Sequence, residues 1–165
     1  MNHLELAQQV GDALTQQGLT ICTAESCTGG LILSHLTDIS GSSAYVLGGI
    51  VTYSNEAKMQ QVDVQEQTLI QYGAVSEPTA REMAIGVRQV FDTDYALSVT
   101  GIAGPGGGTD EKPVGLTFIG LARRDGLVAV QRHVWDGNRI ENKQSSADAA
   151  LMLLVTVIEE QHPSG

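Results

Sequence analysis

The sequence predicts an α/β protein, a single domain in which helices cover both faces of a mixed sheet in a three-layer α/β/α sandwich. Three observations predict this fold. Helix-period runs alternate with short apolar runs typical of strands. An Asp-Gly pair between two of these runs predicts a hairpin, which adds antiparallel pairing to the sheet. The chain has 165 residues, a length that suits one domain, here residues 1–165.

The first third of the chain alternates helix and strand. Residues 3–17 repeat apolar side chains at helical spacing and end at a glycine, which predicts a helix. Residues 19–25 (LTICTAE) form a short apolar run typical of a buried strand, and we expect a helix over residues 28–38. Residues 44–54 (AYVLGGIVTYS) predict a second strand, with a bulge or bend at the glycine pair.

Helices dominate the middle of the chain. We expect Asn55 to cap a short helix, because its side chain can accept hydrogen bonds from free N–H groups. A second short helix is expected near residues 65–72. Ser76 begins a longer amphipathic helix with Pro78 in its first turn, where the missing N–H costs nothing.

The last part of the chain returns to strands and closes with a helix. Residues 95–100 (YALSVT) predict a buried strand that runs into a glycine-rich segment. Residues 114–122 and 127–135 predict two strands joined at residues 123–126 (RRDG), because Asp-Gly accepts positive φ. The final apolar periodicity predicts a helix over residues 138–161.

The composition limits the class of function. Hydrophobic residues make up 42% of the chain and charged residues 17%, which is typical of a soluble globular protein. The net charge of −10 argues against a nucleic-acid partner, although it allows one small phosphorylated ligand held locally. No apolar run approaches membrane-spanning length and the first residues lack a secretion-signal pattern, so we expect a cytoplasmic protein that contacts no membrane.

The metal-binding residue types show no pattern. The two cysteines, Cys22 and Cys27, match neither a zinc spacing nor a disulfide framework. The four histidines are scattered along the chain, and none has a metal-ligand spacing to another. We therefore expect no metal site and no cofactor.

The segment TAESCTGG, residues 23–30, is the first candidate for chemistry. It places Ser26 and Cys27 between a buried strand and the expected start of a helix, where free N–H groups can stabilise an oxyanion. Gly29 and Gly30 allow a substrate to approach closely. The segment therefore suits a nucleophile, although the same residues also fit a serine that only caps a helix.

A nucleophilic serine needs a base, and Lys58 is the candidate. It follows the cap of a short helix, where the helix dipole disfavours a cation, and partial burial would lower its pKa further. Tyr53 could relay the proton or hold the lysine. The alternatives are a solvated lysine and a tyrosine of the core. Cys27 is a rival nucleophile, but as the neighbour of Ser26 it should point elsewhere and pack.

The glycine-rich segment TGIAGPGGG, residues 100–108, is the second candidate. It follows a buried strand, and ligands in α/β sheets bind at such strand ends. Its spacing matches neither the P-loop nor the dinucleotide-binding pattern, and a merely flexible loop remains the alternative. Lys112 and Arg139 could supply positive charge to a phosphate, and Arg139 lies near the N-terminus of the last helix.

Five segments occur in an order that resembles the CinA C-terminal domain family over nearly the whole chain: TAESCTGG, GGIVTYSNEAK, YGAVSEPTAREMA, SVTGIAGPGGGTDEKPVG and WDGNR. The chain looks most similar to the stand-alone nicotinamide-nucleotide amidohydrolases of that family. The resemblance implies an α/β/α sandwich that hydrolyses the carboxamide of nicotinamide mononucleotide to nicotinate mononucleotide and ammonia. It places the nucleophile on Ser26, the lysine on Lys58 and the tyrosine on Tyr53, and it implies a homo-oligomer, often a dimer.

The substrate is expected to contact the turn after the first strand, the glycine-rich segment and the start of the last helix. The residues concerned are Cys27, Thr28, Gly29, Gly30, Thr100, Gly101, Gly104, Gly107, Gly108 and Arg139. The sequence departs from the usual pattern of the family at Gly106, Asn138, Asn142 and Lys143.

Two other functions remain open from the sequence. One is a non-catalytic nucleotide-binding or regulatory module, in which the glycine-rich loops hold a phosphate without chemistry. The other is an amidase for a different small amide. Release of ammonia from a panel of substrates separates these possibilities.

Overall fold

The computed structural model describes residues 1–163 and contains one five-stranded sheet with the strand order β2-β1-β3-β4-β5. β1 pairs in parallel with both β2 and β3, whereas β4 is antiparallel to β3 and to β5. The strands span Ile21–Glu25 (β1), Val46–Val51 (β2), Tyr95–Gly101 (β3), Leu116–Arg123 (β4) and Val128–Val134 (β5). The predicted mixed sheet and the predicted hairpin are therefore confirmed.

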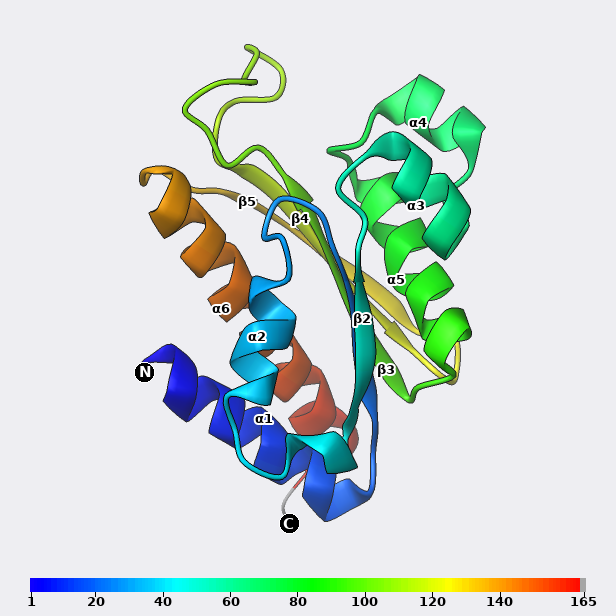
Figure 1. Cartoon of the computed structure of the whole chain (residues 1–165), viewed down its shortest axis with the longest axis vertical. Helices are drawn as coiled ribbons and strands as arrows, with labels where there is room; N and C mark the ends of the chain where they lie inside the picture. The colour runs from blue at the N-terminus through cyan, green and yellow to red at the C-terminus, as the bar shows by residue number, and fades with distance from the viewer. Residues whose placement is uncertain (164–165) are drawn as a thin grey trace.

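Helices lie on both faces of this sheet (Figure 1). One layer holds α1 (His3–Gln17), α2 (Leu31–Thr37) and α6 (Arg139–Gln161), which contact one another. The other layer holds α3 (Asn55–Val62), α4 (Glu66–Tyr72) and α5 (Glu77–Phe91), with α3 and α4 packed on α5. A short 3₁₀ turn spans Ser42–Ala44. The three-layer sandwich expected from the sequence is confirmed.

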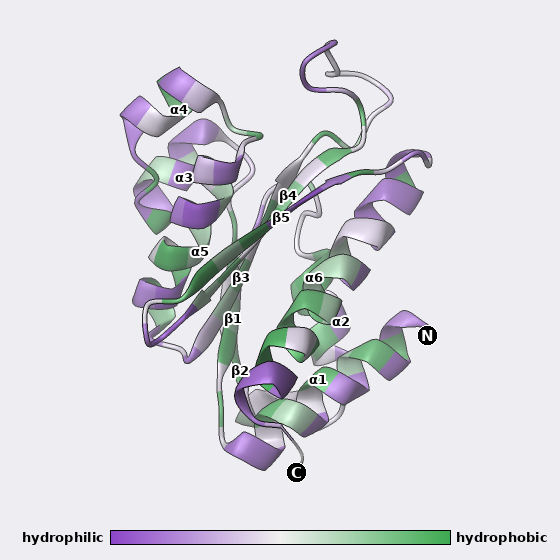
Figure 2. Ribbon diagram, turned by 180° about the vertical axis from the view of Figure 1, so that it is seen from behind, coloured by the Kyte–Doolittle hydropathy of each residue, from purple (hydrophilic) through white to green (hydrophobic). Residues whose placement is uncertain are grey.

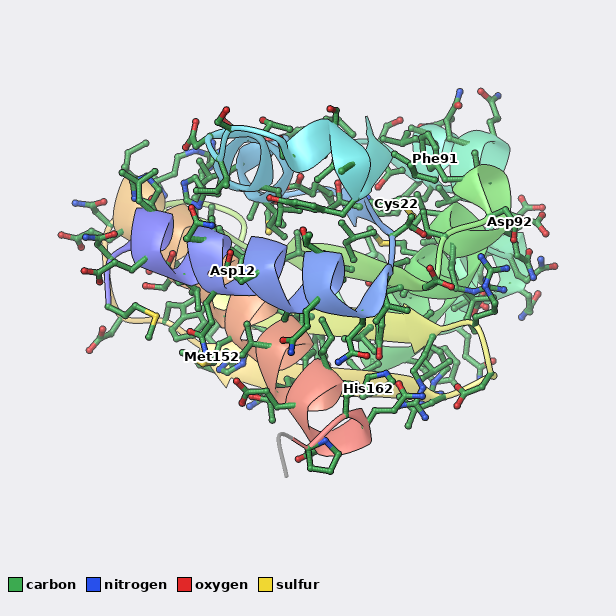
Figure 3. All side chains as sticks on the ribbon, turned by 90° about the horizontal axis from the view of Figure 1, so that it is seen from below. Asp12, Cys22, Phe91, Asp92, Met152 and His162 are labelled. Carbon is green, nitrogen blue, oxygen red and sulfur yellow. The ribbon has the colours of Figure 1, made fainter. Side chains whose placement is uncertain are left out.

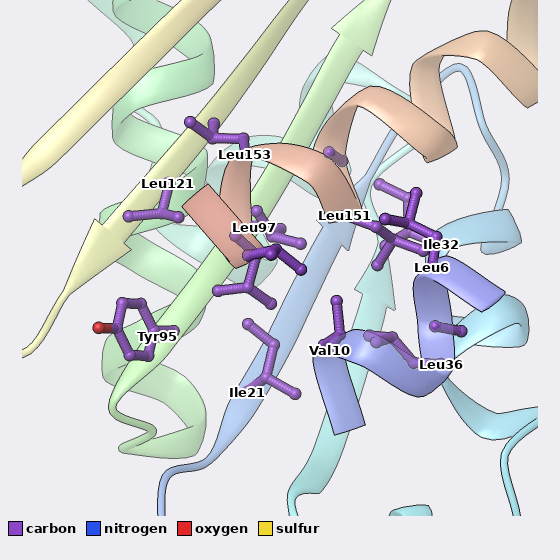
Figure 4. Packing of buried hydrophobic residues seen from close by; sticks show 14 of the residues in the cluster. Leu6, Val10, Ile21, Ile32, Leu36, Tyr95, Leu97, Leu121, Leu151 and Leu153 are labelled. Atoms are coloured by element: carbon purple, nitrogen blue, oxygen red, sulfur yellow. The ribbon is translucent and has the colours of Figure 1, made fainter. Parts of the chain in front are cut away.

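Each face of the sheet has its own apolar core. The larger core joins α1, α2 and α6 to the sheet, and Figure 4 shows Leu6 and Val10 of α1 packed with Ile21, Leu97 and Leu151. The smaller core joins α3 and α5 to the opposite face through Val62, Met83, Val87 and strand residues. Figure 2 shows the hydrophobic strands sandwiched between helices whose outer faces are polar. Burial on both faces explains why β1 and β3 read as continuous apolar runs.

The glycine pair in β2 produces the expected bulge. Ile21 pairs with Val46 but Cys22 pairs with Gly48, so β2 holds one extra residue at this point. A Cβ atom on Gly49 would lie 2.4 Å from Thr23 Oγ1, which explains why a residue without a side chain follows the bulge.

The connection from β1 to α2 differs from the prediction. The helix begins at Leu31 rather than near Thr28, and its N-cap is Gly30, at φ +105° and without a capping side chain. Glu25, the last residue of β1, accepts hydrogen bonds from the Ile32 and Leu33 N–H groups instead. The carboxylate of the preceding strand therefore caps α2, and the residues between form a turn.

The strand order places one crevice at a defined edge of the sheet. The carboxyl ends of the parallel strands β1, β2 and β3 lie together, and the chain leaves β1 into the α2 layer and β2 into the α3 layer. Ligands in α/β sheets bind where neighbouring strands send their connections to opposite faces. Among the described residues, no helix has the length and apolar character needed to span a bilayer.

Candidate active site

A pocket of about 280 Å³ lies at the carboxyl edge of the parallel strands. It is bounded by the turn after β1, the start of α3, the loop after β3 and the first residue of α6. Nine of the predicted site residues line it: Ser26, Cys27, Tyr53, Lys58, Thr100, Gly101, Gly104, Gly107 and Arg139. Residues from four separate segments therefore meet at this one place.

Ser26 and Lys58 form a buried pair on the wall of this pocket. Lys58 Nζ lies 3.0 Å from Ser26 Oγ and donates a second hydrogen bond to the carbonyl oxygen of Thr52 at 2.9 Å. Ser26 follows β1 directly, and its N–H donates to Val99 O of β3 at 3.0 Å, which fixes its backbone to the sheet. The side chain of Lys58 is 1% exposed.

The position of Lys58 follows from the cap of α3. Ser54, rather than Asn55, caps this helix, because its side chain accepts a hydrogen bond from Ala57 N–H. The predicted cap is thus wrong by one residue, and Asn55 lines the pocket instead. Lys58 lies one turn into the helix, where its N–H donates to Ser54 O. Its side chain points inward to Ser26 rather than to solvent.

Burial controls the charge of the lysine. Desolvation lowers the pKa of Lys58 from its ordinary value, and the nearby Cys27 thiol opposes this shift only in part. Among the described residues that line the pocket, none is Asp or Glu. Burial therefore shifts the Lys58 amine toward its neutral form, and no acidic side chain of the described pocket lining opposes this shift.

Cys27 lines the same pocket but its thiol is poorly activated. Burial raises the pKa of Cys27 to about 11, and the carboxylate of Glu25 raises it further, whereas the nearby Lys58 amine acts in the opposite direction. Thiolate is the nucleophilic form of cysteine, so the group that competes with Ser26 is held as a neutral thiol near neutral pH.

Some of the backbone N–H groups in the turn after β1, which the sequence suggested as donors to an oxyanion, already have acceptors within the protein. The N–H of Gly29 donates to Ser26 O at 3.1 Å, and the N–H of Ser26 is used by Val99. The N–H groups at the start of α2 are capped by Glu25. Within residues 1–163, the N–H groups of Cys27 and Thr28 have no oxygen acceptor. Of these two residues, Cys27 lines the pocket and Thr28 does not.

Tyr53 lines the same pocket as Ser26 and Lys58, and its hydrogen bond is to Arg139. Its side chain is 62% exposed, so it is not a residue of the core, and its hydroxyl accepts a hydrogen bond from Arg139 Nη2 at 3.3 Å. Arg139 also donates from Nη1 to Gly104 O at 2.8 Å. Among the described residues, Tyr53 has no hydrogen bond to Ser26 or Lys58, and its role in proton transfer stays a prediction.

The loop after β3 forms the wall opposite α3. Thr100 is 1% exposed and its hydroxyl donates to Ala74 O at 2.8 Å, which ties the end of β3 to the segment before α5. Gly104 adopts φ +89°, a conformation that favours glycine, and a Cβ atom there would lie 2.4 Å from Val114 Cγ1. The backbone of this loop therefore approaches the pocket without side chains in between.

Several predicted residues lie outside the pocket lining of the described chain. They are Thr28, Gly29, Gly30 and Gly108. Thr28 donates its hydroxyl hydrogen bond to Glu25 Oε1 at 2.7 Å, and its side chain is buried. Lys112 donates from Nζ to Tyr72 O, so its amine is also occupied away from the pocket. Thr28 and Lys112 therefore flank the site, and their side chains do not face the pocket.

Two buried polar residues of the site were missed. Glu25 is 1% exposed and holds the turn that carries Ser26, and Asn142 of α6 is 2% exposed and bonds to the loop after β3. An acidic residue at the end of a fully buried strand needs several hydrogen-bond donors, and this requirement could have identified Glu25. Asn142 could have been identified because it is a polar residue on the apolar side of a helix.

The fold and the site together define a class of protein, an α/β/α sandwich with a buried lysine amine on a serine hydroxyl at the ends of parallel strands. The family model described as the CinA C-terminal domain matches residues 3–158. The chain belongs to the CinA C-terminal domain family.

Individual relatives agree with this membership. The chain is 48% identical over 151 residues to the nicotinamide-nucleotide amidohydrolase PncC of Escherichia coli K12, covering 92% of each chain. It is 51% identical over 149 residues to a putative competence-damage inducible protein of Halothermothrix orenii, covering 90% of this chain but 36% of that relative. The chain thus spans about a third of some curated relatives and nearly all of others.

A solved structure has the same fold. The competence/damage inducible protein CihA from Agrobacterium tumefaciens superposes with a TM-score of 0.93 at 44% sequence identity, covering 95% of this chain and 96% of that chain.

Proposed function

We propose that this protein hydrolyses the carboxamide of nicotinamide mononucleotide, giving nicotinate mononucleotide and ammonia, with Ser26 as nucleophile and Lys58 as general base. The observation that carries the proposal is the 3.0 Å contact between the buried Lys58 Nζ and Ser26 Oγ, in a pocket lined by no acidic side chain among the described residues. The PncC relative is named a nicotinamide-nucleotide amidohydrolase and is similar over nearly the full length, which supports the choice of substrate.

The first half of the reaction forms an acyl-enzyme. Ser26 Oγ attacks the carboxamide carbon while its proton moves to Lys58 Nζ. The N–H group of Cys27, which lines the pocket, stabilises the oxyanion, and losing such a donor costs about 3 kcal/mol of barrier. The carbon–nitrogen bond then breaks, and protonated Lys58 gives its proton to the leaving ammonia. Ser26 is left as an ester of the nicotinate group.

The second half releases the product. A water molecule gives a proton to Lys58 and attacks the ester carbon, and the carbon–oxygen bond to Ser26 breaks. Lys58 returns the proton to Ser26 Oγ, so both side chains regain their starting state. The carbonyl oxygen of Thr52 accepts a hydrogen bond from the amine and keeps Nζ beside Oγ through both steps.

The other end of the pocket suits the phosphate of a mononucleotide. Among the described residues, Arg139 donates hydrogen bonds only to neutral oxygens, Gly104 O and Tyr53 Oη, so its charge is available to an anion. The glycine-rich loop adds backbone N–H groups at the same wall. In a protein of net charge −10, a pocket lined by Arg139 and by no acidic residue of the described chain favours an anionic ligand.

Two substitutions test the proposal. Ser26→Ala and Lys58→Met should each lower ammonia release from nicotinamide mononucleotide by at least about 1000-fold, since the two groups act as a unit. Ser42→Ala is the matched serine control, because Ser42 and Ser26 are both 8% exposed. Lys112→Met is the lysine control. Near-normal activity in either site variant would refute the pair.

The wild-type protein tests the substrate. Thermal stabilisation by nicotinamide mononucleotide without ammonia release would show a nucleotide-binding module rather than an amidase. Ammonia release from other small amides, but not from this nucleotide, would keep the mechanism and reject the substrate.

A further inference from the structure

The side chain of Asn142 joins the loop after β3 to the turn before α6. Its Nδ2 donates to Ala103 O at 2.9 Å, and its Oδ1 accepts from Gly137 N–H at 3.0 Å. The residue is 2% exposed, and it does not belong to the described lining of the pocket that contains Ser26. Both ends of the amide are therefore used for structure, and neither is used for direct contact with a ligand.

These bonds fix the direction of one peptide group. The peptide bond between Ala103 and Gly104 is trans, so its C=O and N–H point in opposite directions. Because Asn142 draws the Ala103 C=O toward α6, the Gly104 N–H is turned away from α6. Gly104 lines the pocket, and within residues 1–163 its N–H has no acceptor.

The next peptide along the loop is held by the same helix. Arg139 Nη1 donates to Gly104 O at 2.8 Å, so two successive carbonyl groups of the loop bond to side chains of α6. Gly104 therefore has a carbonyl bonded to the guanidinium of Arg139 and an N–H that has no acceptor among the described residues. A guanidinium beside a backbone N–H with no protein acceptor is an arrangement that binds oxyanions such as phosphate.

We propose that Asn142 is a positioning residue that aims the Gly104 N–H into the pocket, where it donates to the phosphate of the nucleotide next to Arg139. This inference rests on the proposed function for the identity of the ligand. It adds that α6 builds the phosphate subsite by holding the Ala103 and Gly104 carbonyls, and that the selectivity for a phosphorylated substrate depends on a residue that never contacts it.

Two substitutions of Asn142 test this role. Asn142→Leu removes both hydrogen bonds, whereas Asn142→Asp keeps the acceptor for Gly137 N–H and removes the donor to Ala103 O. The measured quantity is kcat/KM for nicotinamide mononucleotide divided by kcat/KM for nicotinamide riboside, which lacks the phosphate. Both variants should lower this ratio by about tenfold, since one hydrogen bond to a charged group is lost. Most of the change should appear in KM for the mononucleotide.

The control is a second buried polar residue of the same helix. Ser146 is 1% exposed, accepts a hydrogen bond from Trp135 Nε1 and donates to the backbone carbonyl of Asn142 at 2.8 Å, and within residues 1–163 it has no hydrogen bond to the loop after β3. Ser146→Ala should lower the melting temperature and leave the substrate ratio unchanged. Equal losses on both substrates in Asn142→Leu and Asn142→Asp, or an unchanged ratio, would overturn the inference.

A separate readout distinguishes this inference from the proposed function. If the wild-type protein releases no ammonia from either substrate, the proposed function fails, and calorimetry with inorganic phosphate then tests Asn142 alone. Weaker phosphate binding by Asn142→Asp than by Ser146→Ala would support the positioning role. Equal binding by the two variants, or no binding by the wild-type protein, would reject it.

Discussion

Charged side chains have different partners at the two ends of the parallel strands. At the amino end of β3, Arg124 contacts Asp92 and Asp94, and Arg123 contacts Asp125. Figure 3 views the molecule from this end, where Asp92 and His162 are labelled. At the carboxyl end, Lys58 and Arg139 bond only to neutral oxygens in the described chain.

This difference distinguishes cations that hold loops together from cations that are available to a ligand. A cation that already has a carboxylate partner gains little from a further anion and serves to hold loops together. A cation without such a partner keeps its charge for a ligand or, when buried, gives up its proton. On the proposed function, the same sheet therefore uses one end of its strands to hold loops together and the other end for chemistry. The predictions below test this comparison, in order of decreasing effect.

The largest effect should come from pH. Burial lowers the pKa of Lys58, so the neutral amine forms at a lower pH than for an ordinary lysine. Below this pKa the amine is protonated and cannot accept the serine proton, so kcat/KM should fall about tenfold for each pH unit. Above it the rate should level off. A profile of kcat/KM against pH without this acid limb would show that Lys58 is not the base.

The next effect should come from Arg139. Arg139→Ala should raise KM for nicotinamide mononucleotide by about tenfold to a hundredfold, because a charge-assisted contact to the phosphate is lost. Inhibition by inorganic phosphate should weaken in parallel. Arg139→Lys should recover only part of the loss, since an ammonium lacks the planar fork of donors. If phosphate inhibition is unchanged in Arg139→Ala, the anion lies elsewhere.

A smaller effect, on stability rather than activity, is expected at the other edge. Burial tends to raise the pKa of Asp94, but hydrogen bonds from Arg124 and Thr20 outweigh it and lower the pKa below its ordinary value. Asp94→Asn should therefore lower the free energy of unfolding by about 1–2 kcal/mol at neutral pH. Chemical denaturation measures this change, and KM and kcat should stay as in the wild-type protein.

The sign of this pH dependence follows from linkage. Because the folded-state pKa of Asp94 is below the unfolded value, its contribution is present above the unfolded pKa. It is lost as the pH falls through the folded pKa, so the wild-type and Asp94→Asn proteins should converge in stability in acid. A constant difference across that range would show that the carboxylate charge is not what stabilises this edge.

The smallest effect is expected at Cys27. Its thiol is held neutral by burial, so Cys27→Ala should keep kcat within about threefold of the wild-type value while its backbone N–H remains in place. Steady-state ammonia release measures the kcat of this variant. An inactive Cys27→Ala protein with normal melting temperature would move the nucleophile from Ser26 to Cys27.

The fold was predictable because its elements carry local signals. Apolar periodicity, the cap at Ser76 and the Asp-Gly turn each appear within a few residues of the structure they specify. The prediction was wrong where a distant or unexpected side chain does the capping. Glu25 satisfies the N–H groups of Ile32 and Leu33, so α2 begins three residues later than the local pattern indicated.

The site was predictable to the extent that it follows strand ends. Ser26 and the glycine loop come directly after β1 and β3, and parallel strands bring their carboxyl ends together. The partner of Tyr53 was not predictable, because Arg139 lies 86 positions away in the chain. The contact of Asn142 with Ala103 is missed for the same reason, since no spacing rule connects α6 to that loop.

The pocket is assembled from segments that lie far apart in the chain. The serine and the lysine belong to the first 60 or so residues, whereas Arg139 and Asn142 lie in α6. On the proposed function, a chain shortened to end after β5 would keep Ser26 and Lys58 but lose the helix that holds the glycine loop, so it would no longer favour a phosphorylated substrate.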